Sequence, residues 1–196
     1  MVEFRNKLEE KWGLFEKTDS FWKQRNIAKI SDRVYLNVLF VPIEEKNYRI
    51  FEERYHCKLS KELNEFYKHY NGIMLFSQSF RIFGMNTLGG TGYQTLSLAF
   101  ENTRLNFKNR CPKYADMISF GYYAEWNFCF DRTKKEKTIY VISRNNYELV
   151  HTFDGLQQLF DHYLPPLIAE YDDEGNKLHP KKDNGLPLYE ISSEFI

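Results

Sequence analysis

Three carboxylates beside strand-like segments are the residues whose types could support acid/base chemistry. Asp116, Glu125 and Asp131 flank the segments DMISFG and WNFCFD, and a hydrolase would need an acid and a base held near its substrate. Acidic residues at strand ends are common, and the sequence shows no sign that the pKa of any of the three is shifted. A hydrolase that uses these residues is the third of three functional hypotheses, behind two binding functions.

Other chemically active residue types lack the spacing that known chemistries require. The GGTG at 89–92 has neither the Lys-Ser/Thr ending of a P-loop nor a G-x-G-x-x-G spacing, so we interpret it as a surface loop. His56 and Cys57 are adjacent, and adjacent side chains seldom meet as a nucleophile and its base. The five histidines form no H-x-x-x-H pair. The three cysteines, Cys57, Cys111 and Cys129, are widely separated, which fits reduced thiols better than a disulfide framework or a zinc site. We expect no catalysis, no metal and no cofactor.

One segment has an unusual charge pattern. Between Asn145 and Asn176 the chain contains no Lys or Arg. The same segment holds these acids: Glu148, Asp154, Asp161, Glu170, Asp172, Asp173 and Glu174. A solvated helix face would explain the pattern, and so would a surface that attracts a basic partner, because surface potential steers association even at zero net charge. Both interpretations stay open, and Asp154 and Asp161 are the candidate contacts.

The aromatic segment GYYAEWNFCFDR is the second candidate for partner binding. Strict alternation places Trp126, Phe128 and Phe130 on one side of a strand, which predicts a core face. The preceding turn residues are expected to stay exposed, and tyrosines beside charges are typical of binding hot spots. The predicted partner-binding residues are therefore Tyr122, Tyr123, Glu125, Asp131, Asp154 and Asp161.

Composition narrows the class of partner. The chain has 196 residues, and Lys plus Arg and Asp plus Glu both total 27, which gives zero formal charge. Proteins that bind polyanions are normally basic, so bulk nucleic-acid binding is disfavoured. No signal-peptide pattern and no long apolar run stand out, so the expected location is cytoplasmic, away from the membrane. The expected oligomeric state is a monomer or weak homodimer.

The elements that position these residues begin with helical patterns. Residues 2–30 are predicted to be helical, with breaks at Gly13 and at the TDS of 18–20, whereas 34–41 suits a strand or a buried connector. A helix follows Pro42 in IEEKNYRIFEERY, with acids early and Arg54 late. Ser60 is the predicted N-cap of KELNEFYKHY, which stops at Asn71-Gly72.

The second half predicts an antiparallel meander. FRIFGM at 80–85 is typical of a strand, and 96–110 of a weaker helix. Four strand-like runs follow, DMISFG, WNFCFD, TIYVIS and YELVHT, with turns at RTKKEK and RNN. A closing helix, FDGLQQLFDHYLPPLIAEY, has Thr152 as its expected N-cap. The prediction is an α+β fold with an antiparallel sheet of about four to six strands and helices packed on one side. Its expected parts, within one structural domain overall, are a helical extension (1–39), the α+β domain (40–171) and a polar linker with a tail (172–196).

The order of these motifs resembles the SUKH superfamily, which includes the fungal cell-wall-assembly regulator domain and many bacterial immunity proteins. The resemblance spans about residues 40–165. It rests on the helix IEEKNYRIFEERY, the helix and stop LSKELNEFYKHYNGI, the strand FRIFGM, the segment ISFGYYAEWNFCFDR with TIYVIS, and the closing HTFDGLQQLFDHYL. The Leu-Pro usual before the second helix is Leu59-Ser60 in this chain, but a capping serine begins a helix as well as an N1 proline does.

This resemblance implies a non-enzymatic binding module without shared catalytic residues. It implies, first, an immunity protein that neutralises a cognate toxin, such as a basic nuclease domain, by stoichiometric binding. The alternative is a regulatory scaffold that binds a host protein, as in the fungal branch. A toxin gene beside this one would favour the first function, and an isolated gene the second.

Overall fold

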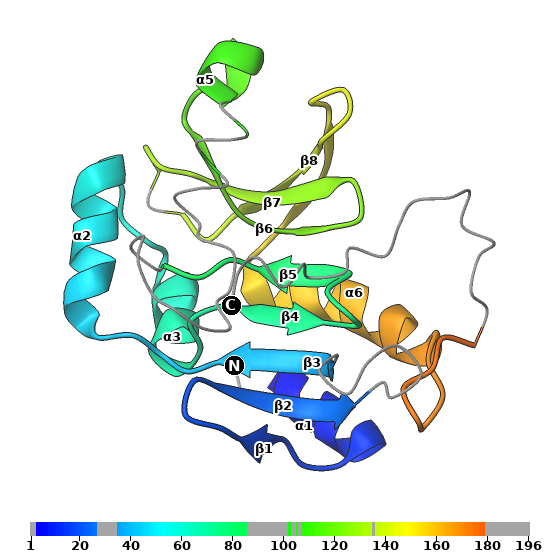
Figure 1. Ribbon diagram of the computed structural model, residues 1–196. Helices are drawn as coiled ribbons and strands as arrows, with labels where there is room; N and C mark the ends of the chain where they lie inside the picture. The colour runs from blue at the N-terminus through cyan, green and yellow to red at the C-terminus, as the bar shows by residue number, and fades with distance from the viewer. Residues whose placement is uncertain are drawn as a thin grey trace, which may run out of the picture.

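A computed structural model describes residues 3–26, 35–85, 102, 105, 107–134 and 136–178 (Figure 1). Among them, nine antiparallel strands form one sheet whose order follows the chain order. The strands are β1 (Glu16–Lys17), β2 (Phe21–Asn26), β3 (Tyr35–Phe40), β4 (Ile73–Leu75), β5 (Phe80–Ile82), β6 (Met117–Tyr123), β7 (Trp126–Asp131), β8 (Ile139–Ser143) and β9 (Leu149–Phe153). The α+β fold with an antiparallel sheet is confirmed, but the expected four to six strands is too low.

Three helices cover one face of this sheet: α1 (Glu3–Trp12), α3 (Lys61–His69) and α6 (Leu156–Ala169). The other described helices are α2 (Glu45–Tyr55) and α5 (Phe107–Arg110), with a 3₁₀ turn at Pro112–Tyr114. The main core joins residues of α1, α3 and α6 to the strands, and Phe160 of α6 packs on both Phe4 of α1 and Phe80 of β5. The short α5 lies on the opposite face, where Phe107 belongs to a smaller cluster with Cys129 and Ile142.

Within residues 3–26 the N-terminal region is helical only as far as Trp12, so the prediction of helix over residues 2–30 is wrong for 13–26, and its last four residues lie outside the described part. Gly13 ends α1 with φ +81, a left-handed conformation in which glycine carries no Cβ penalty. After a turn in which Thr18 Oγ1 and the backbone of Phe21 exchange hydrogen bonds, β2 pairs with β3. Periodicity could not reveal this pairing, because β3 is a separate segment of the chain.

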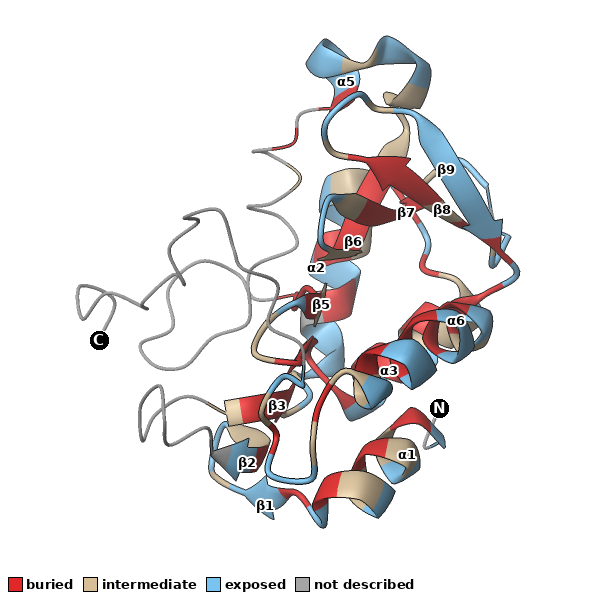
Figure 2. Cartoon of the chain, turned by 90° about the vertical axis from the view of Figure 1, so that its right-hand side faces the viewer, coloured by how far each residue is buried: buried red, intermediate tan, exposed pale blue. Residues whose placement is uncertain are grey.

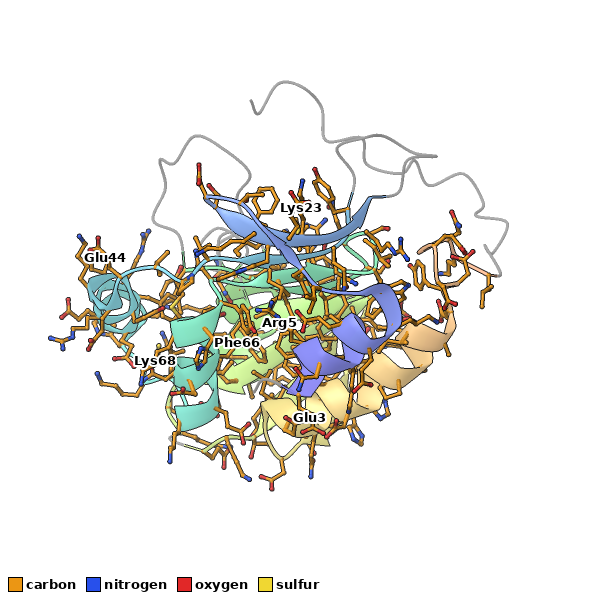
Figure 3. All side chains as sticks on the ribbon, turned by 90° about the horizontal axis from the view of Figure 1, so that it is seen from below. Glu3, Arg5, Lys23, Glu44, Phe66 and Lys68 are labelled. Carbon is orange, nitrogen blue, oxygen red and sulfur yellow. The ribbon has the colours of Figure 1, made fainter. Side chains whose placement is uncertain are left out.

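Helix α1 is hydrogen-bonded to the C-terminal end of α6 and to the segment that follows it. Lys11 Nζ donates to the carbonyl of Ile168 at 2.9 Å, and Trp12 Nε1 donates to the carbonyl of Asp172 at 2.8 Å. Figure 3 shows Phe66 of α3 on the inner side of its helix, near Arg5 of α1. The predicted extension therefore shares the core of the rest of the chain.

A buried amide pair connects α1 to the sheet. The side chain of Gln24 on β2 donates to the carbonyl of Leu8 at 3.2 Å and accepts from Asn37 Nδ2 of β3 at 2.9 Å. Asn37 Oδ1 in turn accepts from the backbone N–H of Phe76 at 3.1 Å. Because buried amides are costly unless they are paired, this network favours one arrangement of α1, β2 and β3.

The predictions for α2 and α3 are confirmed. Ser60 Oγ accepts from the N–H of Leu63 at 3.2 Å, which is the expected N-cap of α3. The helix ends at His69, and Gly72 has φ +92 immediately before β4. Of the 34–41 segment, Tyr35–Phe40 form strand β3, so the strand is the correct one of the two alternatives.

The four predicted strands of the meander are confirmed as β6 to β9, and FRIFGM begins with β5. A bulge between Ser119 and Gly121 interrupts the β6–β7 register. Gly121 is required there, since a Cβ would collide with the carbonyl of Arg81 on β5. Of the weak helix expected over 96–110, the structure confirms α5, and the GGTG at 89–92 lies outside the described residues.

Candidate partner-binding surface

Strand β9 forms a long exposed edge of the sheet. Within the described residues it pairs with β8 alone, and its first four residues are exposed. Leu149 is 47% exposed and Val150 51%. The opposite edge, β1, is only two residues long and consists of Glu16 and Lys17, which suits a protected edge. Figure 2 shows β9 in pale blue along one side of the sheet, above α6.

A bulge shapes this edge strand. Val141 lies opposite His151 and Ile142 opposite Leu149, so Val150 is the additional residue on β9. The His151 ring stacks on His162 of α6, with ring centroids 5.9 Å apart and an interplanar angle of 18°. Together, β9 and the exposed side of α6 form a continuous surface, which we call the β9–α6 surface.

The acidic residues of this surface are partly neutralised by basic residues from other elements. Lys137 Nζ lies 3.0 Å from Asp154, and Lys7 Nζ of α1 lies 2.8 Å from Asp161. The hydrogen bond from Lys7, supported by one from Gln157, lowers the pKa of Asp161 below its ordinary value. The two carboxylates are exposed and their lysine partners are at least partly so, which makes the pairs weak, and the surface keeps its capacity to attract cations.

Tyr122 is held between two arginines. The guanidinium of Arg144 lies 4.8 Å from the centroid of the Tyr122 ring, and that of Arg81 lies 5.6 Å from it. Tyr122 is only half-buried, so an aromatic ring flanked by two cations reaches the surface on the sheet face opposite α6. This predicted residue is therefore in a basic environment, unlike Asp154 and Asp161.

Tyr123 and Glu125 have different environments from each other. Tyr123 points toward α6, where its ring lies 5.3 Å from that of Tyr163, and burial followed by the charge of Glu170 raises the pKa of its phenol. Glu125 is exposed in the β6–β7 turn, and its carbonyl accepts from the N–H of Arg144 at 2.7 Å. Of the two, only Glu125 is a fully exposed candidate.

Asp131 closes a turn at the end of β7. Its carboxylate accepts from the Thr133 N–H at 2.9 Å and the Thr133 hydroxyl at 2.6 Å, and Lys134 lies 3.6 Å away. Burial opposes ionisation, but the bonds from Thr133 and the charge of Lys134 hold the pKa of Asp131 below its ordinary value. This arrangement gives Asp131 a structural role within its own turn.

The three carboxylates considered for hydrolysis do not come together. Asp116 forms an ion pair with Arg132 at 2.8 Å, beside the end of the β6–β7 hairpin where Asp131 pairs with Met117. Glu125 lies at the opposite end of that hairpin, where Tyr123 pairs with Trp126. Six residue steps along a strand span roughly 20 Å, so Glu125 is too far from Asp116 and Asp131 to form an acid/base pair with either of them.

A shallow depression of about 450 Å³ lies between the end of α2 and the turn after β7, lined by Glu52, Glu53, His56, Cys57, Lys58, Arg132, Thr133 and Lys134. Burial raises the pKa of the Cys57 thiol to about 12, so it stays protonated and is a poor nucleophile. Lys58 is paired with Glu52 at 2.7 Å. Within the described part of the chain, no group of three or more His, Cys, Asp or Glu side chains is arranged to hold a metal ion.

Sequence reasoning missed the exposed apolar residues of β9. The last strand of a meander is an edge strand by topology, and LVHT contains two apolar residues in succession, which was the available signal. It also missed Arg81 and Arg144, because the stacking on Tyr122 joins three distant segments.

Comparison with known proteins identifies one family. Residues 42–162 match the model of the SMI1 / KNR4 family (SUKH-1). No curated protein matches the chain. Among the described helices, none has both the length and the apolar composition needed to cross a membrane.

Proposed function

Because this chain belongs to the SMI1 / KNR4 family (SUKH-1), we propose that it is a non-enzymatic protein-binding module that acts as an immunity protein. It binds a cognate toxin domain in the cytoplasm in a stoichiometric complex and blocks the toxin's active site. A basic toxin domain, such as a nuclease, suits the exposed acids of the β9–α6 surface.

The observation that carries this proposal is the exposed edge strand beside acidic residues. Natural proteins normally protect a sheet edge, yet β9 leaves Leu149 and Val150 about half exposed. Exposed apolar residues next to charges are typical of surfaces that bind other proteins. Asp154 directly follows this strand and Asp161 lies on α6, and both supply charges that steer a basic partner toward the β9–α6 surface.

Co-expression with the neighbouring open reading frame tests the proposal. Cells that express that reading frame alone should stop growing, and simultaneous expression of this protein should restore growth. The two chains should also co-purify at a 1:1 ratio. A matched control is the Ile50→Lys variant, which changes an apolar residue 45% exposed on α2 and should rescue growth as well as the wild type does.

A harmless neighbouring gene product would contradict the immunity function. If that product nevertheless bound this protein stably, the regulatory scaffold would become the better explanation. Growth inhibition that co-expression does not relieve would also contradict the proposal.

A further inference from the structure

We propose that β9 binds its partner by strand addition: an extended segment of the toxin domain, with Lys or Arg next to its apolar part, pairs along the outer edge of β9. This inference rests on the proposed function and specifies how the partner is recognised. The partner segment would extend the sheet beyond its ninth strand.

The first reason is the backbone of β9. A strand that pairs on one side only presents a row of N–H and C=O groups on its other side. Within the part of the chain that the structure describes, β9 pairs with β8 alone and contains no Lys, Glu, Asp or Pro. Those are residue types that usually prevent edge pairing, so on either side of the bulge at Val150 the edge is open to main-chain hydrogen bonds from an added strand.

The second reason is the position of the exposed apolar side chains. Leu149 and Val150 are consecutive and lie at the bulge of β9, where the regular alternation of faces is interrupted. An added strand would lie about 4.8 Å away and could bury its own apolar side chains against these two residues. Leu149 and Val150 are 47% and 51% exposed, so this contact area is available.

The third reason is charge, which selects the occupant. Glu148 immediately precedes β9, and its carboxylate accepts from the side-chain amide of Asn146 at 2.7 Å. It has no cation within ion-pair distance among the described residues, whereas Asp154 has Lys137 at 3.0 Å. A basic residue of the partner segment would therefore pair with Glu148.

A second copy of this chain fits the edge less well. Symmetric antiparallel pairing about His151 would place Glu148 of one copy opposite Asp154 of the other, at both ends of the interface. Like charges directly opposite each other destabilise a strand pair. In this register, charge therefore disfavours self-association, whereas a basic segment from another protein would meet an acid at each end of β9.

Binding of a synthetic strand tests the inference without the toxin. The probe is a fluorescein-labelled peptide, Arg-Thr-Val-Thr-Val-Thr-Arg, measured by fluorescence anisotropy with the full chain. The matched probes carry Glu in place of both Arg, or N-methyl groups on alternate residues, which remove backbone donors. The Arg peptide should bind about tenfold more tightly than either matched probe.

Protein variants locate the site. Leu149→Lys and Val150→Lys should weaken binding of the Arg peptide about tenfold. Ile50→Lys on α2, with a similar exposed apolar residue, should bind like the wild type. Circular dichroism should show unchanged melting for all three variants, because the residues are at the surface.

Several results would overturn the inference: no binding of the Arg peptide to the wild type at about 1 mM, equal binding of the N-methylated probe, or equal loss in all three variants. A wild-type dimer that Val150→Lys dissociates in sedimentation would show that a second copy occupies the edge. If Val150→Lys loses the peptide but still rescues growth fully, strand addition is not how the toxin binds, and the immunity function stands. If the wild type fails to rescue growth, the proposed function falls while the peptide assay still tests the edge.

Discussion

The carboxylate of Glu62 on α3 accepts a hydrogen bond from the backbone N–H of Leu156 at 2.5 Å, across 94 residues of sequence. Leu156 is the first residue of α6, and its N-cap position is Gly155, which has no side chain to satisfy the free N–H groups. A carboxylate at a helix N-terminus also interacts favourably with the helix dipole. The cap of α6 is therefore supplied by another helix, and the prediction of Thr152 as N-cap is wrong.

Removal of this cap should destabilise the protein. Glu62→Ala should lower the free energy of unfolding by about 1–2 kcal/mol, as the loss of other N-caps does. Glu62→Gln should cost less, since its amide oxygen can still accept the bond. Urea denaturation measures both, with Glu65→Ala as the control, because Glu65 lies on the exposed side of the same helix. Equal losses for Glu62→Ala and Glu65→Ala would contradict the capping role.

The contrast between Ser60 and Glu62 shows which parts of the fold the sequence could predict. Ser60 caps its own helix three residues before Leu63, so the signal is local and readable. Glu62 caps a helix that only the tertiary fold brings near, and nothing in the adjacent sequence marks it. The same distinction explains why α2, α3 and the hairpins of β6 to β9 could be predicted and β1, β2 and β4 could not.

Helix α1 should be necessary for folding although it lies outside residues 42–162, the part that matches the family. Leu8 is fully buried in the main core, so Leu8→Ala should lower the free energy of unfolding by about 2–5 kcal/mol. Leu14→Ala is the control, because Leu14 is 83% exposed. A fragment of residues 42–162 should fail to melt cooperatively. A cooperative transition in that fragment would show that α1 and β1 to β3 are dispensable.

The candidate binding residues were harder to predict than the fold. Residues next to a hairpin turn are normally exposed, which is correct for Glu125. Tyr122 and Tyr123 are covered in part by residues from other segments, Arg81 and Tyr163 among them. Asp154 and Asp161 are exposed as expected, but the lysines that pair with them, Lys137 and Lys7, lie outside the acidic segment in the sequence. A count of charges along that segment could not show these pairs.

Stability should fall in alkaline solution, in part through Tyr163. Burial, followed by the nearby Tyr123, raises the pKa of the Tyr163 phenol to about 12 from its ordinary 10.0. A raised folded-state pKa means that this contribution to stability is complete below pH 10 and is lost as the pH rises through 12. Tyr163→Phe should therefore be nearly neutral at pH 7 and make the alkaline loss shallower.

Urea denaturation at several pH values between about 7 and 11 measures this effect. The half-buried Tyr114 offers the control variant Tyr114→Phe, which removes the same hydroxyl elsewhere. An identical pH dependence of the wild type and Tyr163→Phe would show that ionisation of Tyr163 does not contribute.

Charge reversal on the β9–α6 surface should slow association with a basic toxin domain. Asp154→Lys together with Asp161→Lys leaves Lys137 and Lys7 without their anions and makes the surface basic. Exposed ion pairs contribute only about 0–1 kcal/mol, so the variant should still fold. Stopped-flow mixing should show an association rate about tenfold lower at low salt, with the difference shrinking at high salt. The matched control reverses Glu44 and Glu45, two exposed acids at the start of α2 that are also paired with basic residues. If the Asp154 and Asp161 reversal leaves both the rate and its salt dependence unchanged, these acids do not steer the partner, and the attraction must come from another surface.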